Sequence, residues 1–364
     1  MPKINSYPVS MNELLTMAVE RGTSDVHIVP MQPPIFRINR EMIQLSEYPV
    51  LKPDDVKALL VQVIKPYQVE ILKKELELDF SHSIPNIARF RGNVMFQRGT
   101  PALAMRIVPF KIPRLEDLGV LDGVKDLCFL PRGLVLVTGP TGSGKSTTLA
   151  AMIDIINTER DLNIVTVEDP IEFLHSHKMS SVKQREVGID TRSFANALRH
   201  VLRHDPDVIL IGEMRDLDSI SIALTAAETG HLVFSTLHTQ TAPLTINRIV
   251  DAFAEHQRDQ IRQQLTGSLQ AVLSQQLIPN IKGDGRVLAM EFLKANTAVR
   301  SMIREAKEHQ LYSVMQASHA AGMRTMDQTL VELYSKGKIS RNEALEKCID
   351  KNEVERLLQR QTLS

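Results

Sequence analysis

The 364-residue sequence is poor in aromatic residues and in cysteine, and it has no excess charge of either sign. Aromatic residues make up 4% of the chain and tryptophan is absent, so there is little material for stacking nucleobases. Basic and acidic residues number 43 each, which argues against an electrostatic grip of the whole chain on nucleic acid. From the balanced charge and the few aromatic residues, no nucleic-acid partner is expected. Cys128 and Cys348 form no metal-type cluster, so they indicate a reducing, cytoplasmic setting.

Long apolar runs are also missing from the sequence. No stretch approaches the roughly 18 apolar residues that span a bilayer, and no apolar run of a signal peptide follows the amino terminus. We therefore expect any membrane contact to go through partner proteins. With 43% hydrophobic residues, the length predicts about two domains, each with a core of its own.

The stretch Gly139–Thr147 has the pattern G-x-x-x-x-G-K-S of a phosphate-binding loop. The apolar run 134–138 predicts a buried strand before it, and helix-forming residues follow it. Lys145 would reach the β- and γ-phosphates, and the Ser146 hydroxyl would ligate Mg²⁺. Glycines let backbone N–H groups turn towards phosphate oxygens. The predicted ligands are a nucleoside triphosphate and Mg²⁺, bound by Gly139, Pro140, Thr141, Gly142, Ser143, Gly144, Lys145, Ser146 and Thr147.

Two further apolar strands end in acidic residues, Glu213 after 208–211 and Glu168 after 163–167. Ligands of open α/β sheets bind at the carboxyl ends of the strands, where Glu213 would polarise the water that attacks the γ-phosphate. Glu168 and Asp169 are candidates for contacts with Mg²⁺ or water. A helix-start role for Glu213 and ordinary turn chemistry at Asp169 remain the alternatives.

The histidines His231 and His238 stand at the two ends of the predicted strand 232–236. His238 would lie near the γ-phosphate end of the sheet, where a neutral imidazole can hydrogen-bond the phosphate or the attacking water. A pair of structural histidines fits the same pattern, and the spacing does not suggest a zinc site.

Residues 81–115 contain no Asp or Glu but several arginines. Gly99 and Pro101 mark a turn between two strands, so this segment predicts a β-hairpin. Arg91 and Arg106 would lie on the faces opposite the buried residues, which include Phe90, Val94, Phe96, Leu103 and Met105. The hairpin is either an anion-facing surface that contacts phosphates or a solvated face paired with carboxylates elsewhere in the sequence.

The pattern of strands and helices changes near residues 110–120, where Pro109, Pro113 and Gly119 indicate a linker. Before it we expect a helix at 9–22, a helical pattern at 53–76 that is interrupted near Pro66, strands at 25–29 and 35–38, and the hairpin. After it the alternation predicts an α/β fold with a mostly parallel sheet, its elements being 134–138, 146–158, 163–167, 193–203, 208–211, 216–229 and 232–236. Beyond residue 255 the chain is expected to be largely helical.

These motifs, in this order, resemble the secretion-superfamily hexameric ATPases and, within them, the PilT-type pilus retraction motors. The resemblance runs from about residue 9 to the carboxyl terminus. It includes a Walker A loop, an aspartate box, a Walker B segment and a histidine box, at Gly139–Thr147, Thr166–Glu172, Asp205–Glu213 and His231–His238. Two isolated cysteines exclude the tetracysteine element of pilus assembly relatives. Residues 298–305 read A-V-R-S-M-I-R-E where retraction motors have A-I-R-N-L-I-R-E, and Ser301 leaves a PilU-like accessory motor open.

The resemblance implies a RecA-like P-loop ATPase domain at 113–364, preceded by a smaller PAS-like α+β domain at 1–112. It implies a homohexamer that hydrolyses ATP with Mg²⁺, with Glu213 activating water and Glu168 assisting. Arg91 and Arg106 match the family's arginine fingers, and His231 and His238 would couple hydrolysis to domain rotation.

The implied load is the removal of pilins through an inner-membrane pilus platform protein. Other pilus motor ATPases are further expected partners, and the motor would be cytoplasmic and peripheral at the inner membrane. A nucleic-acid translocase on the same RecA-like core and a non-hydrolysing nucleotide sensor are the rival functions. Zero net charge disfavours the first, and the presence of Glu213 disfavours the second.

Overall fold

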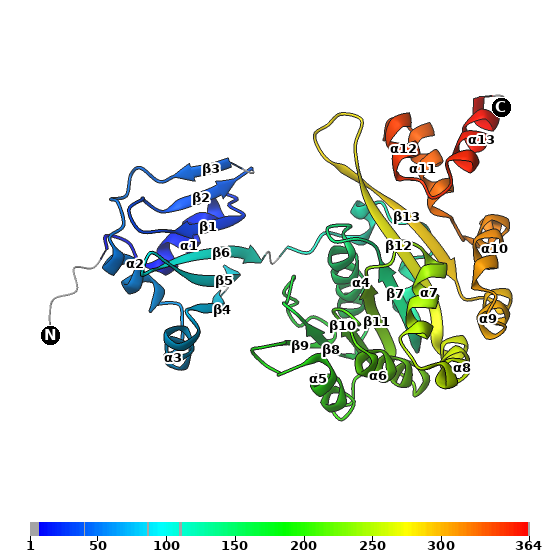
Figure 1. Ribbon diagram of the computed structural model, residues 1–364, viewed down its shortest axis with the longest axis horizontal. Helices are drawn as coiled ribbons and strands as arrows, with labels where there is room; N and C mark the ends of the chain where they lie inside the picture. The colour runs from blue at the N-terminus through cyan, green and yellow to red at the C-terminus, as the bar shows by residue number, and fades with distance from the viewer. Residues whose placement is uncertain (1–6, 40, 86, 109–110, 363–364) are drawn as a thin grey trace. The chain divides into compact units, whose positions relative to one another are not determined.

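The computed structural model describes residues 7–362 except 40, 86, 109 and 110, and it contains two compact units (Figure 1). The first unit comprises the described residues up to Lys111 together with Glu172–Leu174, and the second comprises Ile112–Ile171 and the chain from His175 onward. Pro109 of the predicted linker and the first six residues lie outside the described residues. No described helix is both long and apolar enough to cross a bilayer.

The first unit is an antiparallel sheet of six strands, in the order β3-β2-β1-β6-β5-β4, with three helices (Figure 1). The strands are β1 Asp25–Ile28, β2 Ile35–Ile38, β3 Glu41–Gln44, β4 Glu77–Ile84, β5 Ala88–Gln97 and β6 Thr100–Val108. The helices are α1 Met11–Glu20, α2 Pro53–Leu60 and α3 Pro66–Glu75. Ser10 begins α1 with a capping box, and the helix buries its apolar stripe in the core of this unit.

The predicted hairpin is formed by β5 and β6, which are joined at Arg98 and Gly99, both with positive φ angles. Such residues fit a tight two-residue turn whose twist matches that of the strands. Phe90 and Val94 are buried as expected, but Phe96 is 38% exposed, which corrects the prediction. Phe96 pairs with Pro101 next to the turn, at the end of the ladder, where less of the unit covers it.

The second unit is a sheet of seven strands in the order β13-β12-β7-β11-β10-β8-β9, parallel except for the pair β12–β13. The strands are β7 Gly133–Thr138, β8 Asn163–Glu168, β9 Ser181–Glu186, β10 Val208–Ile211, β11 Leu232–Leu237, β12 Leu269–Pro279 and β13 Arg286–Lys294. The helices are α4 Lys145–Glu159, α5 Phe194–Val201, α6 Leu217–Glu228, α7 Ala242–Asp251, α8 Arg258–Ser268, α9 Thr297–Arg304, α10 Leu311–Ala317, α11 Met326–Ser335, α12 Arg341–Lys347 and α13 Lys351–Thr362. The predicted α/β class with a parallel sheet is confirmed.

The strands β12 and β13 correct the expectation that the chain beyond residue 255 is largely helical. β12 lies inside the sheet, between β7 and β13, and is buried along most of its length. A strand buried on both faces does not alternate in sequence, and its Leu, Gln and Ala residues are also good helix formers. The pattern therefore resembled a helix, while the pairing with β7 decides for a strand.

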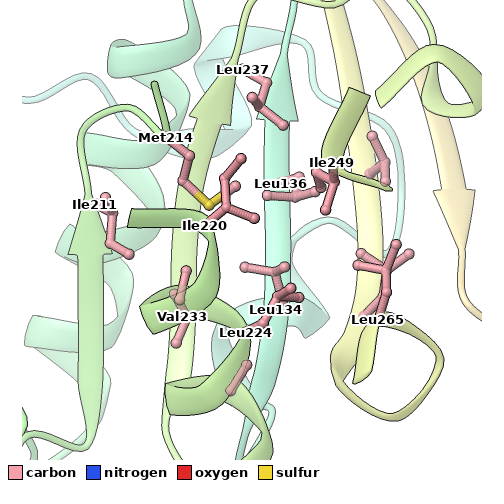
Figure 2. Close-up of a cluster of buried hydrophobic side chains, with 14 of the residues drawn as sticks. Leu134, Leu136, Ile211, Met214, Ile220, Leu224, Val233, Leu237, Ile249 and Leu265 are labelled. Atoms are coloured by element: carbon pink, nitrogen blue, oxygen red, sulfur yellow. The ribbon is translucent and has the colours of Figure 1, made fainter. Parts of the chain in front are cut away.

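Helices cover both faces of this sheet. Alternate residues of β7 belong to different cores: Leu134 and Leu136 pack with helices α5 to α10, and Val135 and Val137 pack with α4. Figure 2 shows the first core, in which Met214 and Leu237 lie among buried side chains of the sheet and α6. Met214 follows Glu213 and Leu237 precedes His238, so this core anchors the backbone beside both polar residues.

A buried carboxylate joins the β13 strand to two helices. Glu291 is 0% exposed, and its two oxygens accept from the first backbone N–H of α7 (Ala242, 2.6 Å) and of α11 (Met326, 3.3 Å). These N–H groups have no partner within their own helices. Burial, with a smaller contribution from the charge of Asp327, raises the Glu291 pKa to about 7, against the two amide hydrogen bonds that lower it.

We expect the pH dependence of stability to report this carboxyl group. Its folded pKa lies above its unfolded value, so its stabilisation is complete below about pH 4.5 and is lost as the pH rises through 7. The loss amounts to about 3 kcal/mol, and Glu291→Gln should remove this part of the slope. Thermal midpoints between pH 5 and 8 measure it, with exposed Glu228→Gln as the control. An unchanged slope in Glu291→Gln would contradict the assignment.

Candidate active site

The phosphate-binding loop connects β7 to α4, as its sequence pattern requires. Gly139 has a φ of +137°, and a Cβ atom there would lie 2.3 Å from the Gln275 carbonyl oxygen on β12, so only glycine fits. Gly144, with φ +91°, is the N-cap residue of α4. The loop therefore ends at a helix amino terminus, whose N–H groups and dipole favour an anion.

Lys145, the first residue of α4, is buried and folds back over the loop. Its Nζ donates to the carbonyl oxygens of Gly139 (2.8 Å) and Pro140 (3.0 Å). Burial lowers the Lys145 pKa, and the charge of Glu213 acts in the opposite direction. A desolvated ammonium group that is bound only by neutral carbonyls is stabilised strongly by a nearby anion. Phosphate oxygens therefore fit this position.

The hydroxyl of Ser143 gives an independent sign that the loop fits phosphate. Ser143 is 2% exposed, and its Oγ has no hydrogen-bond partner among the residues that the structure describes. A buried hydroxyl without a partner is costly, and it can donate to a phosphate oxygen held by the loop.

Glu213 lies between two donors at the carboxyl end of β10. Its Oε2 accepts from Arg215 Nε at 2.8 Å, and its Oε1 lies 3.0 Å from His238 Nε2. Because these strands are parallel, the carboxyl ends of β7, β11 and β10 lie at the same end of the sheet. β11, which leads to His238, lies between β7, which leads to the loop, and β10, which leads to Glu213. The hydrogen bond and charge of Glu213 raise the Arg215 pKa. The carboxylate is thus oriented, and each oxygen keeps a further lone pair that can accept from a water.

Glu168 is the last residue of β8, at the same carboxyl end of the sheet, and it is buried. Its Oε1 accepts from Thr166 Oγ1 at 2.7 Å and from Gln184 Nε2 at 3.1 Å. The backbone of Gly212 approaches it closely, since a Cβ there would lie 3.2 Å from the Glu168 Cα. The side chain is thus held in place beside the Glu213 strand, and its assisting role remains a prediction.

His231 does not join this group within the chain. It precedes β11, whose six residues separate it from His238 by about 20 Å of extended strand. Its Nδ1 lies 2.9 Å from the carbonyl oxygen of Ala226 near the end of α6. This contact is at the amino end of the parallel strands, opposite the phosphate-binding loop. The two histidines therefore lie at opposite ends of the strand, as the sequence predicted, and a coupling role of His231 stays a prediction.

We expect the two histidines to differ in their effect on hydrolysis. His238→Ala removes a donor to a charged carboxylate, worth about 1.5 to 3 kcal/mol, and should lower kcat about 10- to 100-fold. His231→Ala should leave kcat within about twofold, because its ring contacts the Ala226 carbonyl at the amino end of the parallel strands, away from the phosphate-binding loop. Steady-state ATPase assays measure both variants. A larger effect of His231 than of His238 would contradict this geometry.

Arg91 and Arg106 face each other in the β5–β6 ladder of the first unit. Asp25 on β1 is the next residue across the sheet, and its Oδ1 accepts from Arg106 Nε at 2.9 Å. Arg91 is exposed and makes no ion pair within the described part of the chain. Arg106 thus pairs with a carboxylate from a distant part of the sequence, which is one of the two alternatives for the hairpin. Arg91 has no such ion pair among the residues that the structure describes. The Arg106 side chain is still 69% exposed, so it remains accessible to a further anion.

The residues around Ser146 fit a magnesium ion shared with a nucleotide. Within the described ranges no group of three or more His, Cys, Asp or Glu side chains could hold a metal ion. Ser146 is exposed on the first turn of α4, next to Lys145. Mg²⁺ usually takes few protein ligands and completes its shell with phosphates and water, so one hydroxyl at this position is compatible.

Three contacting residues were not predicted from the sequence. Arg215 binds Glu213, Asp25 binds Arg106, and Gln275 bonds Thr148 of α4 at 2.8 Å while its backbone packs on Gly139. Arg215 stands two residues after Glu213 in the sequence, so its position was visible although its contact was not. Asp25 and Gln275 come from distant strands, and their sequence surroundings contain no signal for these contacts.

Comparisons with known proteins match nearly the whole chain. A family model described as type II/IV secretion system protein matches residues 5–356. The chain is 47% identical over 339 residues to the type IV pilus retractation ATPase PilT of Pseudomonas aeruginosa, covering 93% of this chain and 98% of that protein. The type IV pilus ATPase PilU of the same organism is 37% identical, covering 93% and 88%. A crystal structure of the pilus retraction motor PilT with bound ADP has a TM-score of 0.90 at 49% identity, covering 96% of this chain and 99% of that one.

Proposed function

Because the chain belongs to the type II/IV secretion system protein family, we propose that it is an ATP-driven motor that powers type IV pilus retraction. It is a nucleotide-binding ATPase, with the RecA-like domain of this family. The main observation behind the proposal is that His238 and Arg215 orient the Glu213 carboxylate at the end of the sheet where the phosphate-binding loop lies. This site lies in a chain similar along 93% of its length to a retraction ATPase.

We assign nucleotide binding to the loop Gly139–Thr147. Lys145 would exchange its bonds to the loop carbonyls for β- and γ-phosphate oxygens, while backbone N–H groups at the start of α4 hold the β-phosphate. Ser146 would ligate Mg²⁺, which when bound neutralises charge on the phosphates. ATP is the nucleotide that the family resemblance favours.

Water activation is assigned to Glu213. A water accepted on its free lone pairs would be polarised for attack on the γ-phosphate, and the proton would pass to the carboxylate. His238 and Arg215 keep the carboxylate oriented before the reaction, so little reorganisation is needed during it. Arg91 and Arg106 are assigned as the arginine fingers that neutralise the γ-phosphoryl group in the transition state.

The proposed assembly is a homohexamer in the cytoplasm, held at the inner membrane through the pilus platform protein. Domain rotation during hydrolysis would drive pilin removal, and other pilus motor ATPases would act on the same machine. The closer similarity to PilT (47%) than to PilU (37%) favours the principal motor over an accessory one. Ser301 is the feature that keeps the accessory alternative open, and its hydroxyl donates to the side chain of Glu305, just after α9, at 2.8 Å.

A deletion strain tests the proposed load. We expect cells that carry many pili and do not twitch, because assembly continues while retraction stops. Restoring the wild-type chain should restore twitching, and restoring Lys145→Ala should not. Bald cells would point to pilus assembly instead, and cells that still twitch would make this chain an accessory motor.

A further inference from the structure

A basic pocket lies away from the phosphate-binding loop, between edge strand β9 and helix α5. Its volume of about 520 Å³ is within the range of small-molecule sites. Lys183 and Arg185 of β9, Arg192 before α5, and His200 and His204 at the end of α5 line it. β9 is the fourth strand from β7, about 19 Å across the sheet, so the pocket is separate from the ATP site.

The two cations of β9 are held in position without being neutralised. Lys183 and Arg185 are two residues apart, so they project from the same face of the strand. Lys183 Nζ donates to the Asn163 side-chain oxygen at 2.9 Å, and Arg185 Nη2 donates to the Asp190 carbonyl oxygen at 2.9 Å. Both acceptors are uncharged, so the positive charges and most of the N–H donors remain available to an anion.

Acidic compensation is weak in this pocket. Of the described residues that line it, Asp190 is the one acid, and its carboxylate accepts from the Glu186 backbone N–H at 2.9 Å. Arg192 makes no ion pair within the described part of the chain. Arg199 of α5 is not among the residues that line the pocket, and it is paired with Asp218 at 2.8 Å. The chain thus neutralises a neighbouring arginine but not those of the pocket, although its charges balance overall.

Protection of the sheet edge does not account for this arrangement. A lysine on an edge strand discourages pairing with another chain, which explains Lys183. It does not explain Arg192, His200 and His204, which lie outside β9, in α5 or the segments on either side of it, and line the same pocket. Clustering cations without a ligand raises self-repulsion, so an anion is the occupant that the charges favour.

We propose that this pocket binds a phosphate-bearing ligand, with phosphate oxygens on Lys183, Arg185 and Arg192. Fork-shaped guanidinium groups and a lysine are well suited to phosphate geometry. Val165 and Val201, both buried, line the floor of the pocket beneath these charges. The ligand is either a free phosphorylated small molecule or the headgroup of an anionic lipid. The site is distinct from ATP hydrolysis, so it stands or falls independently of the motor function.

Valine methyl NMR of the full-length chain tests the proposal, using Lys145→Ala to suppress phosphate binding at the loop. Titration with pyrophosphate should give saturable shifts of the Val165 and Val201 methyl signals. The double variant K183Q/R185Q should weaken this binding at least tenfold, while the matched variant R199Q should stay within twofold. Unchanged melting temperatures verify that the variants fold.

Flotation with phosphatidylglycerol vesicles, against phosphatidylcholine vesicles, separates the two sources of phosphate. Pyrophosphate binding without flotation supports a free ligand, and flotation lost in K183Q/R185Q supports a lipid headgroup. If neither probe binds, or if K183Q/R185Q binds as the parent does, the proposal is wrong. Binding of polyglutamate but of neither phosphate probe would also overturn it, in favour of an acidic protein segment.

Discussion

Replacing Glu213 with Gln is expected to reduce kcat for ATP hydrolysis about 100- to 1,000-fold while ATP affinity stays within a few-fold. The amide keeps the size of the side chain but cannot accept the proton of the attacking water. The carboxylate lies between Arg215 and His238, at the same carboxyl end of the sheet as the phosphate-binding loop. Because the effect belongs to the chemical step, it should appear in single-turnover experiments as well as at steady state.

The matched control for this variant is Glu228→Gln. Glu228 is exposed at the end of α6 and accepts from Gln264, away from the phosphate-binding loop, so turnover should be unchanged. If Glu213→Gln hydrolyses ATP at the wild-type rate, another group activates the water and our assignment fails. A parallel loss of nucleotide affinity would instead mean that Glu213 acts mainly by shaping the loop.

Replacing Arg91 or Arg106 with Ala is expected to reduce turnover by about 10³-fold or more, with ATP affinity within about tenfold. Like charges directly opposite each other in a sheet are destabilising, so this pair has a cost that a phosphate would offset. Arginine fingers interact mainly with charge that develops in the transition state, so kcat should change more than binding. ATPase rates and nucleotide affinities of the single variants measure the two effects.

Asp25 makes the two arginines distinguishable. Asp25→Asn weakens the hydrogen bond to Arg106 and leaves Arg91 untouched, so it should lower turnover less than Arg106→Ala does. Arg98→Ala, in the hairpin turn, is the control and should be neutral. Loss of ring assembly with normal chemistry at each site would make Arg91 and Arg106 structural instead.

The sequence predicted those parts of the fold and site that depend on neighbouring residues. Helix α1, strand β7, the glycine loop and α4 all lie where local pattern placed them, because capping, periodicity and φ preferences act over a few positions. The prediction was wrong where burial erased the pattern, as in β12, and beside the hairpin turn at Phe96. It was silent on β9, a short edge strand whose two cations, Lys183 and Arg185, stand at alternate positions and line the basic pocket.

Two features of the site could be predicted from the sequence: a loop that binds a nucleoside triphosphate, and a carboxylate at the end of another strand. Both follow from contiguous residues, since the glycine spacing and the apolar runs specify their own local geometry. The partners that orient the charged side chains become visible in the folded chain alone. Arg106 meets Asp25 across 81 positions of sequence, and Glu213 meets His238 through the order of parallel strands. Strand order and register arise from packing of the whole sheet, and no local stretch encodes them.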